Sequence, residues 1–199
     1  MAITYPLTLP VAPREVTLEL RKSVGKAASE FTFQAQAQIH QGDIWLATFE
    51  YPPLERAAAD ELIGMLWSPE DMQFYLGPTG ARKTPKGIAT GTPLVKGAGQ
   101  TGFTLLTDGW TAGQTNIMKR GDFLSFGGFL YCLAAPADSD GSGNATLELA
   151  NRIRAATSDN DPITVNSPVG IFRLLSPRQS VQWNVIQHAG IVLEAEEVL

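Results

Sequence analysis

The stretch from Ile117 to Leu149, IMKRGDFLSFGGFLYCLAAPADSDGSGNATLEL, decides how the rest of the chain is divided. Phe123 to Phe126 is a short apolar run, and Gly127-Gly128 separates it from a second apolar run that starts at Phe129. A loop of small polar residues then precedes a third strand pattern, which ends at Leu149. Apolar and aromatic runs broken by glycine are typical of strands joined by tight turns. The stretch therefore predicts a compact antiparallel β-module.

Around this module, the sequence changes character at about residues 79 and 164. Between these positions glycine recurs so often that helices are effectively excluded. Residues 1–78 carry longer strand patterns and one helical pattern, whereas residues 165–199 carry strand patterns alone. Because the C-terminal strands have no core of their own, we expect them to pack with residues 1–78. The predicted organisation is one domain of residues 1–78 and 165–199, interrupted by a small β-domain of residues 79–164.

The clearest period-two alternation runs from Glu30 to Tyr51. Apolar residues occupy every second position, first from Phe31 and again, after Gln41-Gly42-Asp43, from Trp45. Such alternation on both sides of a glycine-containing turn predicts a long β-hairpin with one buried face. Residues 21–29 are expected to form a loop before this hairpin.

The other face of the predicted hairpin carries glutamines in place of charged residues. Charges on a strand usually discourage pairing with another chain, so an uncharged face favours strand addition. We therefore predict that the hairpin is an assembly element. Its candidate interface residues are Phe31, Phe33, Gln34, Gln36, Gln38, His40 and Trp45.

One helix is predicted after Pro52-Pro53. Apolar residues then recur at helical spacing, and Ser68-Pro69 ends the pattern. The helix is expected to cover the buried face of the hairpin. Its apolar stripe consists of Leu54, Ala58, Leu62, Met65 and Leu66. A short strand from Gln73 to Leu76 is expected to follow.

Composition and charge exclude several classes of protein. The chain has 199 residues, a formal net charge of −5 and 44% hydrophobic residues, so it can build an ordinary globular core without the basic stripe of a nucleic-acid binder. The single cysteine, Cys132, lies in an apolar run, where we expect a buried thiol. The proline-rich N-terminus predicts an extended arm, without the pattern of a signal peptide or a membrane anchor. We expect synthesis in a cytosol and no membrane partner.

Motifs for catalysis and metal binding are weak. The GxGxxG pattern at residues 97–102 precedes a strand pattern, so it predicts a turn and not a dinucleotide site. The loop from Asp138 to Asn144 has the spacing of a calcium loop, but Leu149 occupies the position of the bidentate acid. His40 and His188 lie in strand patterns without the motifs of base catalysis. We predict no catalytic residue, no metal and no cofactor.

Five segments carry a resemblance to a known family. In chain order they are WLATFEYPPLERAAADELIGMLW (45–67), FYLGP (74–78), GTPLVKGAGQTGFTLLTDGWT (91–111), MKRGDFLSFGGFLYCLAAPADSDGSGNATLEL (118–149) and PVGIFRLL (168–175). This succession resembles the distal tail proteins of long-tailed bacteriophages, from about Val16 to Leu199. The motifs are turns, strand openings and aromatic anchors, and the likeness lies in their order.

The resemblance implies a mainly β protein with one α-helix. A tail-tube-like β-sandwich would be built from residues 1–78 and 165–199, and residues 79–164 would form an inserted small β-barrel of the oligosaccharide-binding-like or galectin-like kind. The resemblance also implies a structural subunit of the virion that forms a hexameric ring at the tail tip. Such a ring joins the tail tube protein to the hub or baseplate protein and lines the DNA channel, and the family has no catalytic residues.

Acidic residues are unevenly distributed between the two expected domains. Residues 1–78 and 165–199 hold 7 Lys+Arg and 13 Asp+Glu, whereas residues 79–164 hold 8 and 7. Lysine contacts with phosphate hold DNA in place, so a channel that DNA must cross suits an acidic or neutral wall. We therefore expect double-stranded DNA to pass the ring without specific binding.

An alternative function of another class is the binding of host-surface carbohydrate by residues 79–164. Its candidate site residues are Trp110, Asp138, Asp140 and Asn144. A lone tryptophan is more often a core or interface residue than a platform for sugars, and a barrel fold does not confer a function. Saturable glycan binding would favour this alternative, whereas a ring in solution would favour the structural subunit.

Overall fold

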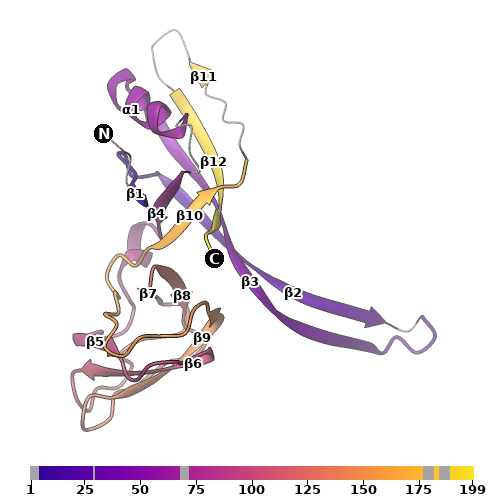
Figure 1. Cartoon of the computed structure of the whole chain (residues 1–199), viewed down its shortest axis with the longest axis vertical. Helices are drawn as coiled ribbons and strands as arrows, with labels where there is room; N and C mark the ends of the chain where they lie inside the picture. The colour runs from indigo at the N-terminus through magenta and orange to yellow at the C-terminus, as the bar shows by residue number, and fades with distance from the viewer. Residues whose placement is uncertain (1–4, 29, 68–71, 177–181, 184–188) are drawn as a thin grey trace.

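The computed structural model describes residues 5–28, 30–67, 72–176, 182–183 and 189–199 (Figure 1). Within these ranges the protein is mainly β with a single α-helix, which confirms the predicted fold class at that level. A large sheet and the helix form one part of the molecule, and residues 79–164 form a second part beside it. A two-stranded arm extends away from both parts (Figure 1).

The large sheet contains seven strands among the described residues. They are β1 (Leu7–Thr8), β2 (Glu15–Ala28), β3 (Ala35–Leu54), β4 (Gln73–Leu76), β10 (Gly170–Leu174), β11 (Gln182–Trp183) and β12 (Ala189–Glu197). Their order is β1-β4-β10-β12-β3-β2, and β11 pairs with β12. Strands from both ends of the chain therefore share one sheet, because β10 pairs with β4 and β12 pairs with β3. The sequence from Ser180 to Gln187 alternates around Trp183 and predicts a strand, but most of this segment lies outside the described residues.

Helix α1 (Arg56–Leu66) contributes its apolar side to the core of this sheet. Its buried residues are Ala59, Leu62, Ile63 and Leu66. They belong to the same hydrophobic cluster as Trp45, Phe49 and Tyr51 of β3. The helix therefore covers the buried face of this part of β3, as the sequence predicts. Leu54, Leu62 and Leu66 of the predicted stripe are buried, as expected. Ala58 and Met65 are half-buried, and the buried side also includes Ala59 and Ile63. The predicted stop at Ser68-Pro69 lies outside the described residues.

The predicted hairpin with a turn at Gln41-Gly42-Asp43 is wrong. β3 continues without a turn through these residues, and its partner is β2, which includes the residues predicted to be a loop. The register shifts between the pairs Lys22↔Asp43 and Val24↔Ile39, so the glycine signal marks a bulge and not a turn. The chain reverses between β2 and β3, where the described residues are 30–34.

The burial predicted for the first half of the alternation is also wrong. Phe31 and Phe33 are 95% and 88% exposed. The reason is that β12 pairs with β3 only between Leu46 and Leu54 and burial on β3 begins near Trp45, so the part of β3 before Asp43 extends beyond the core. Alternation indicates a strand, but a buried face needs a second layer to cover it.

Residues 79–164 contain a separate three-stranded sheet and a β-hairpin. The sheet has the order β5-β6-β9, with β5 (Gly91–Val95), β6 (Gly102–Trp110) and β9 (Ala145–Ile153), and a short 3-10 helix, η1 (Gly80–Lys83), precedes it. The hairpin consists of β7 (Phe123–Phe126) and β8 (Phe129–Cys132), as the sequence predicts. Gly127 and Gly128 connect its strands with φ values of +59° and +85°, which glycine adopts without strain in a two-residue turn. The GxGxxG pattern is likewise a turn, between β5 and β6.

The β7-β8 hairpin joins two hydrophobic cores. Leu124 and Tyr131 lie in the core of residues 79–164, whereas Phe123 and Leu130 lie in the core of the large sheet. The Trp45 ring contacts Phe123, and its Nε1–H donates a hydrogen bond to the Leu130 carbonyl at 2.8 Å. The two parts of the molecule are therefore packed against each other through alternate faces of one hairpin.

Two buried tyrosines predict a loss of stability at alkaline pH. Burial raises the pKa of Tyr131 to about 12 and raises the pKa of Tyr51 well above its ordinary value. Their contribution to stability is therefore complete below about pH 10, the unfolded value, and is lost as the pH rises through the folded-state values. We expect the melting temperature to fall steeply between about pH 10 and 12.

The Tyr51→Phe variant isolates part of this effect. The Tyr51 hydroxyl has no hydrogen-bond partner among the described residues, so its removal should change the stability at pH 7 little or increase it slightly. The alkaline loss of melting temperature should be smaller in this variant than in the parent. If the melting temperature of the two proteins depends on pH in the same way, Tyr51 does not contribute to the alkaline loss of stability.

Candidate assembly surfaces and candidate ligand cleft

The arm, defined as residues 21–42, is a two-stranded ribbon that leaves the body of the molecule (Figure 1). All the side chains of β2 from Arg21 to Ala28 are exposed, as are those of Ala35 to Gln38 on β3. No third strand pairs with the arm among the described residues. An isolated two-stranded ribbon is marginally stable in water, so the arm is a surface that requires a partner.

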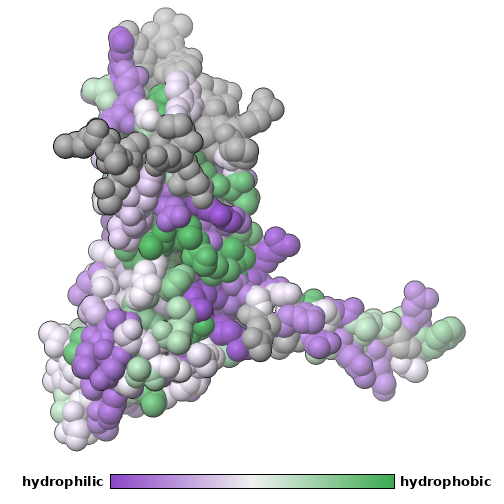
Figure 2. Space-filling model, in the orientation of Figure 1, coloured by the Kyte–Doolittle hydropathy of each residue, from purple (hydrophilic) through white to green (hydrophobic). Residues whose placement is uncertain are grey.

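The structure places most of the predicted interface residues on this arm. Gln36 and Gln38 lie opposite Ala27 and Gly25 in the register and are exposed, and exposed His40 follows on the same strand. The tip between the strands carries Phe31, Phe33 and Gln34, whose side chains are exposed, and Figure 2 shows a hydrophobic end on the arm. Trp45 is separate from this group, because it is 5% exposed and packs in the core.

The outward face of the large sheet is a second candidate surface, and it is acidic. Glu15 on β2 lies directly opposite Glu50 on β3, although like charges in such pairs are unfavourable. Glu19, two residues further along β2, and Glu194 on β12 are exposed on the same face. Two basic side chains of the described sheet accompany this face: Arg21 is exposed two residues beyond Glu19 on β2, and Arg173 Nη2 lies 2.8 Å from the Glu196 carboxylate.

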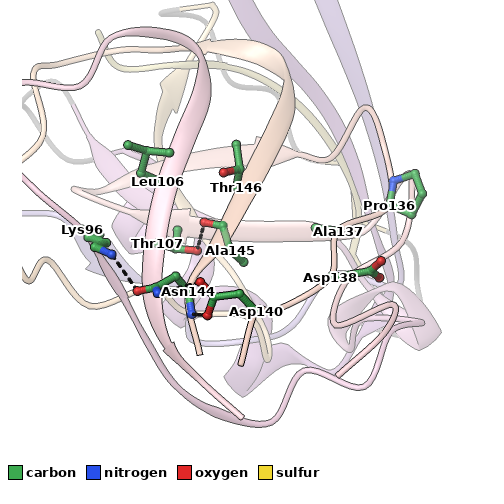
Figure 3. Close-up of a pocket in the computed structure, with 10 residues that line it drawn as sticks. All are labelled: Lys96, Leu106, Thr107, Pro136, Ala137, Asp138, Asp140, Asn144, Ala145 and Thr146. Carbon is green, nitrogen blue, oxygen red and sulfur yellow. Dashed lines mark hydrogen bonds between the residues drawn. The ribbon is translucent and has the colours of Figure 1, made fainter. Parts of the chain in front are cut away.

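A cleft of about 500 Å³ lies on residues 79–164 and contains three of the four residues proposed for ligand binding (Figure 3). Asp140 accepts hydrogen bonds from the backbone N–H groups of Ser142 and Asn144 and from the Asn144 side chain, each at 2.8 Å, and these bonds lower the pKa of Asp140. The Lys96 ammonium donates to Asn144 Oδ1 at 2.8 Å, and Asp138 accepts from the Asn116 backbone at 2.6 Å. These polar groups therefore hold the loop in shape.

Trp110, the fourth proposed residue, does not line this cleft. Its side chain is 4% exposed and packs in the core of residues 79–164. Its Nε1–H donates to the buried Thr107 hydroxyl at 2.8 Å. The Trp110 ring is therefore placed as a core residue, and it cannot stack on a ligand at the surface.

The candidate residues for base or metal chemistry are not brought together. His40 lies on the exposed arm, and His188 lies outside the described residues. Cys132 is partly buried in β8, and burial raises the pKa of its thiol. Among the described residues, no group of three or more His, Cys, Asp and Glu side chains is arranged to hold a metal ion.

An ionic cluster at the root of the arm was not predicted from the sequence. The Arg154 guanidinium contacts the carboxylates of Asp43 on β3 and Glu197 on β12, with an Nη2 to Oε2 distance of 2.7 Å to Glu197. All three side chains are at most 7% exposed. Glu197 also accepts the Trp45 backbone N–H, and Asp43 accepts the Arg152 backbone N–H at 2.9 Å. Burial raises the pKa of Glu197, and the hydrogen bonds from Arg154 oppose this rise.

This cluster ties three segments that are far apart in the sequence. Asp43 belongs to the root of the arm, Arg154 follows the last strand of residues 79–164, and Glu197 lies near the end of the chain. A spacing of more than one hundred residues between Asp43 and Arg154 gives no local signal, so sequence patterns could not have identified it.

Comparison with known proteins finds no protein-family model and no curated protein that matches the sequence of this chain. None of the helices in the described part of the chain is both long enough and apolar enough to cross a membrane.

Proposed function

We propose that this protein is a structural subunit of a bacteriophage tail tip, which assembles into a hexameric ring through its arm. The arm carries the proposal, because β2 and β3 are 14 and 20 residues long and their distal halves extend beyond any core of the described chain. A ribbon of this kind gains stability only when another chain covers it or pairs with its edge. The kind of assembly, a hexameric ring, is inferred from the resemblance to distal tail proteins in the order of the sequence segments.

The two parts of the molecule fit roles within such a ring. We infer that the large sheet with α1 is the tail-tube-like β-sandwich, and that residues 79–164 are the inserted small β-barrel of the oligosaccharide-binding-like or galectin-like kind. The ring would connect the tail tube protein to the hub or baseplate protein of the virion. This role is structural and needs no catalytic residue, metal or cofactor.

The acidic sheet face is proposed as the wall of the DNA channel. Glu15, Glu19, Glu50 and Glu194 present carboxylates on one exposed face of the large sheet. Such a wall repels phosphate and lets double-stranded DNA pass without being held. In a density map of the assembled ring, we expect these residues to face the lumen. A lumen lined mainly by lysine and arginine from residues 1–78 and 165–199 would exclude this arrangement.

The mass of the purified full-length chain tests the ring directly. We expect multi-angle light scattering to give a particle about six times the 21.4 kDa mass of one chain. Negative-stain images of the same sample should show rings with a central channel. A chain that remains monomeric at the highest soluble concentration and forms no ring when mixed with the tail tube protein of its phage would overturn the proposal.

The alternative of carbohydrate binding has one supporting observation, which is the cleft of Figure 3. Its lining offers Asp138, Thr146 and Lys96 as polar groups, but the lining lacks an aromatic side chain. Titration of the full-length protein with glycans from the host surface tests this function. Saturable binding that is lost in the Asp138→Ala variant would favour it over a role in assembly alone.

A further inference from the structure

The arm ends in an exposed apolar tip. Phe31 and Phe33 are the two most exposed large hydrophobic residues among those described, at 95% and 88%. Phe33 also has a φ of +54°, a conformation that is unfavourable for a bulky side chain and requires support from its surroundings. Exposed aromatic side chains at the end of a projecting ribbon suit anchors that insert into a partner surface.

An apolar cleft of about 240 Å³ lies on the other side of the molecule. It forms where the segment between β1 and β2 meets the two connections to residues 79–164. Its lining includes Leu9, Ala12, Tyr75, Pro168 and Val169. In Figure 1 the strands beside it, β1 and β4, lie opposite the direction in which the arm extends. A space of this size can receive an aromatic ring.

The charges beside the tip and the cleft are complementary. Glu30 is exposed and directly precedes Phe31. Lys83 is exposed at the end of η1 and lines the cleft. A negative charge beside the anchor and a positive charge at the receiving site fix the orientation of a contact and suppress wrong partners.

We propose that the aromatic tip of one copy, formed by Phe31 and Phe33, occupies the cleft beside Tyr75 and Lys83 on the next copy. The tip cannot reach the cleft of the same copy, because the ribbon between Lys22 and Ala28 is about 20 Å long and points away from that cleft. This proposal rests on the proposed ring and specifies the contact that joins neighbouring copies in it, which we call the joint. Because tip and cleft lie on opposite sides, each copy donates one arm and receives another, which is the head-to-tail contact that a ring requires.

A cysteine pair tests the proposed joint. The Gln34→Cys and Ala12→Cys substitutions place one thiol beside the tip and one at the cleft, and both positions are exposed. In a Cys132→Ala background, a short bismaleimide should link neighbouring copies into a ladder of covalent oligomers that ends at the size of the ring. Each single-cysteine variant should give no ladder. If rings form but no ladder appears, the joint is wrong and the ring stands; if the parent forms no ring, the proposed function fails.

A charge exchange gives a second, independent test. The Glu30→Lys and Lys83→Glu variants should each raise the midpoint concentration of assembly by about tenfold or more, and the double variant should return it toward the parent value. The Phe31→Ser/Phe33→Ser double variant should weaken assembly at least as much. Ile88→Ser is the matched control, since Ile88 is 58% exposed and lines neither the tip nor the cleft.

These variants should leave the melting temperature of the monomer unchanged, because all the substituted side chains are exposed. Weakened assembly with an intact fold and rescue by the charge exchange would support the joint. Single variants that assemble like the parent, or a double variant without rescue, would overturn it.

Discussion

Replacement of Arg154 with alanine should lower the free energy of unfolding by about 3–5 kcal/mol. The reason is that the variant leaves the carboxylates of Asp43 and Glu197 buried without their cation, and a buried unpaired charge is very unfavourable. Urea denaturation followed by tryptophan fluorescence measures the effect. Parent and variant must be compared at one protein concentration, because assembly stabilises the folded state.

The matched control for this prediction is Arg173→Ala. Arg173 also contacts a carboxylate, Glu196 at 2.8 Å, but its side chain is 46% exposed and its partner is 24% exposed. Water replaces most of that interaction, so we expect a loss of at most about 1 kcal/mol. Equal losses for the two variants would show that the buried cluster does not hold the root of the arm to residues 79–164.

Removal of the arm should abolish the ring while the body of the molecule remains folded. Lys22 and Asp43 are direct partners in the register, so an Asn-Gly turn can join them after residues 23–42 are deleted. The deleted side chains are exposed where the structure describes their burial, and their removal exposes no core. We expect a monomer by light scattering, with a melting temperature within a few degrees of the parent monomer.

The Ile88→Ser variant serves as the control for the excision, because it keeps the arm and changes one exposed side chain outside it. This variant should assemble like the parent. If the chain without the arm still forms rings, then the joint between copies lies elsewhere, and the edge of β2 on the large sheet becomes the next surface to test. An unfolded product would contradict the description of the arm as a ribbon outside the core.

Local patterns in the sequence determined several elements. The apolar spacing predicted α1, the short strand from Gln73 to Leu76 has the bounds of β4, and Gly127-Gly128 predicted the turn of the β7-β8 hairpin. Each of these signals depends on residues that are neighbours along the chain. Backbone preferences of glycine and the periods of helices and strands act at that range, so the sequence alone is sufficient.

Tertiary structure decided which of the predicted strand faces are covered. The same alternation runs along Phe31 and Phe33 and along Trp45 and Phe49, but only the second pair lies where α1 and β12 supply a core. The register of β2 against β3 also turned the glycine at Gly42 into part of a bulge. Period-two patterns give the direction of side chains and cannot give the partner strand.

The candidate sites also contain some features that the sequence identified and others that only the folded structure defined. The sequence identified the glutamines of the arm and the loop from Asp138 to Asn144, because unusual composition is visible in one stretch. Only the folded chain removed Trp45 and Trp110 from the surface, brought Arg154 between Asp43 and Glu197, and placed the aromatic tip and the apolar cleft on opposite sides of one subunit. Burial and long-range pairing depend on residues that approach each other only after folding, and no local pattern records that approach.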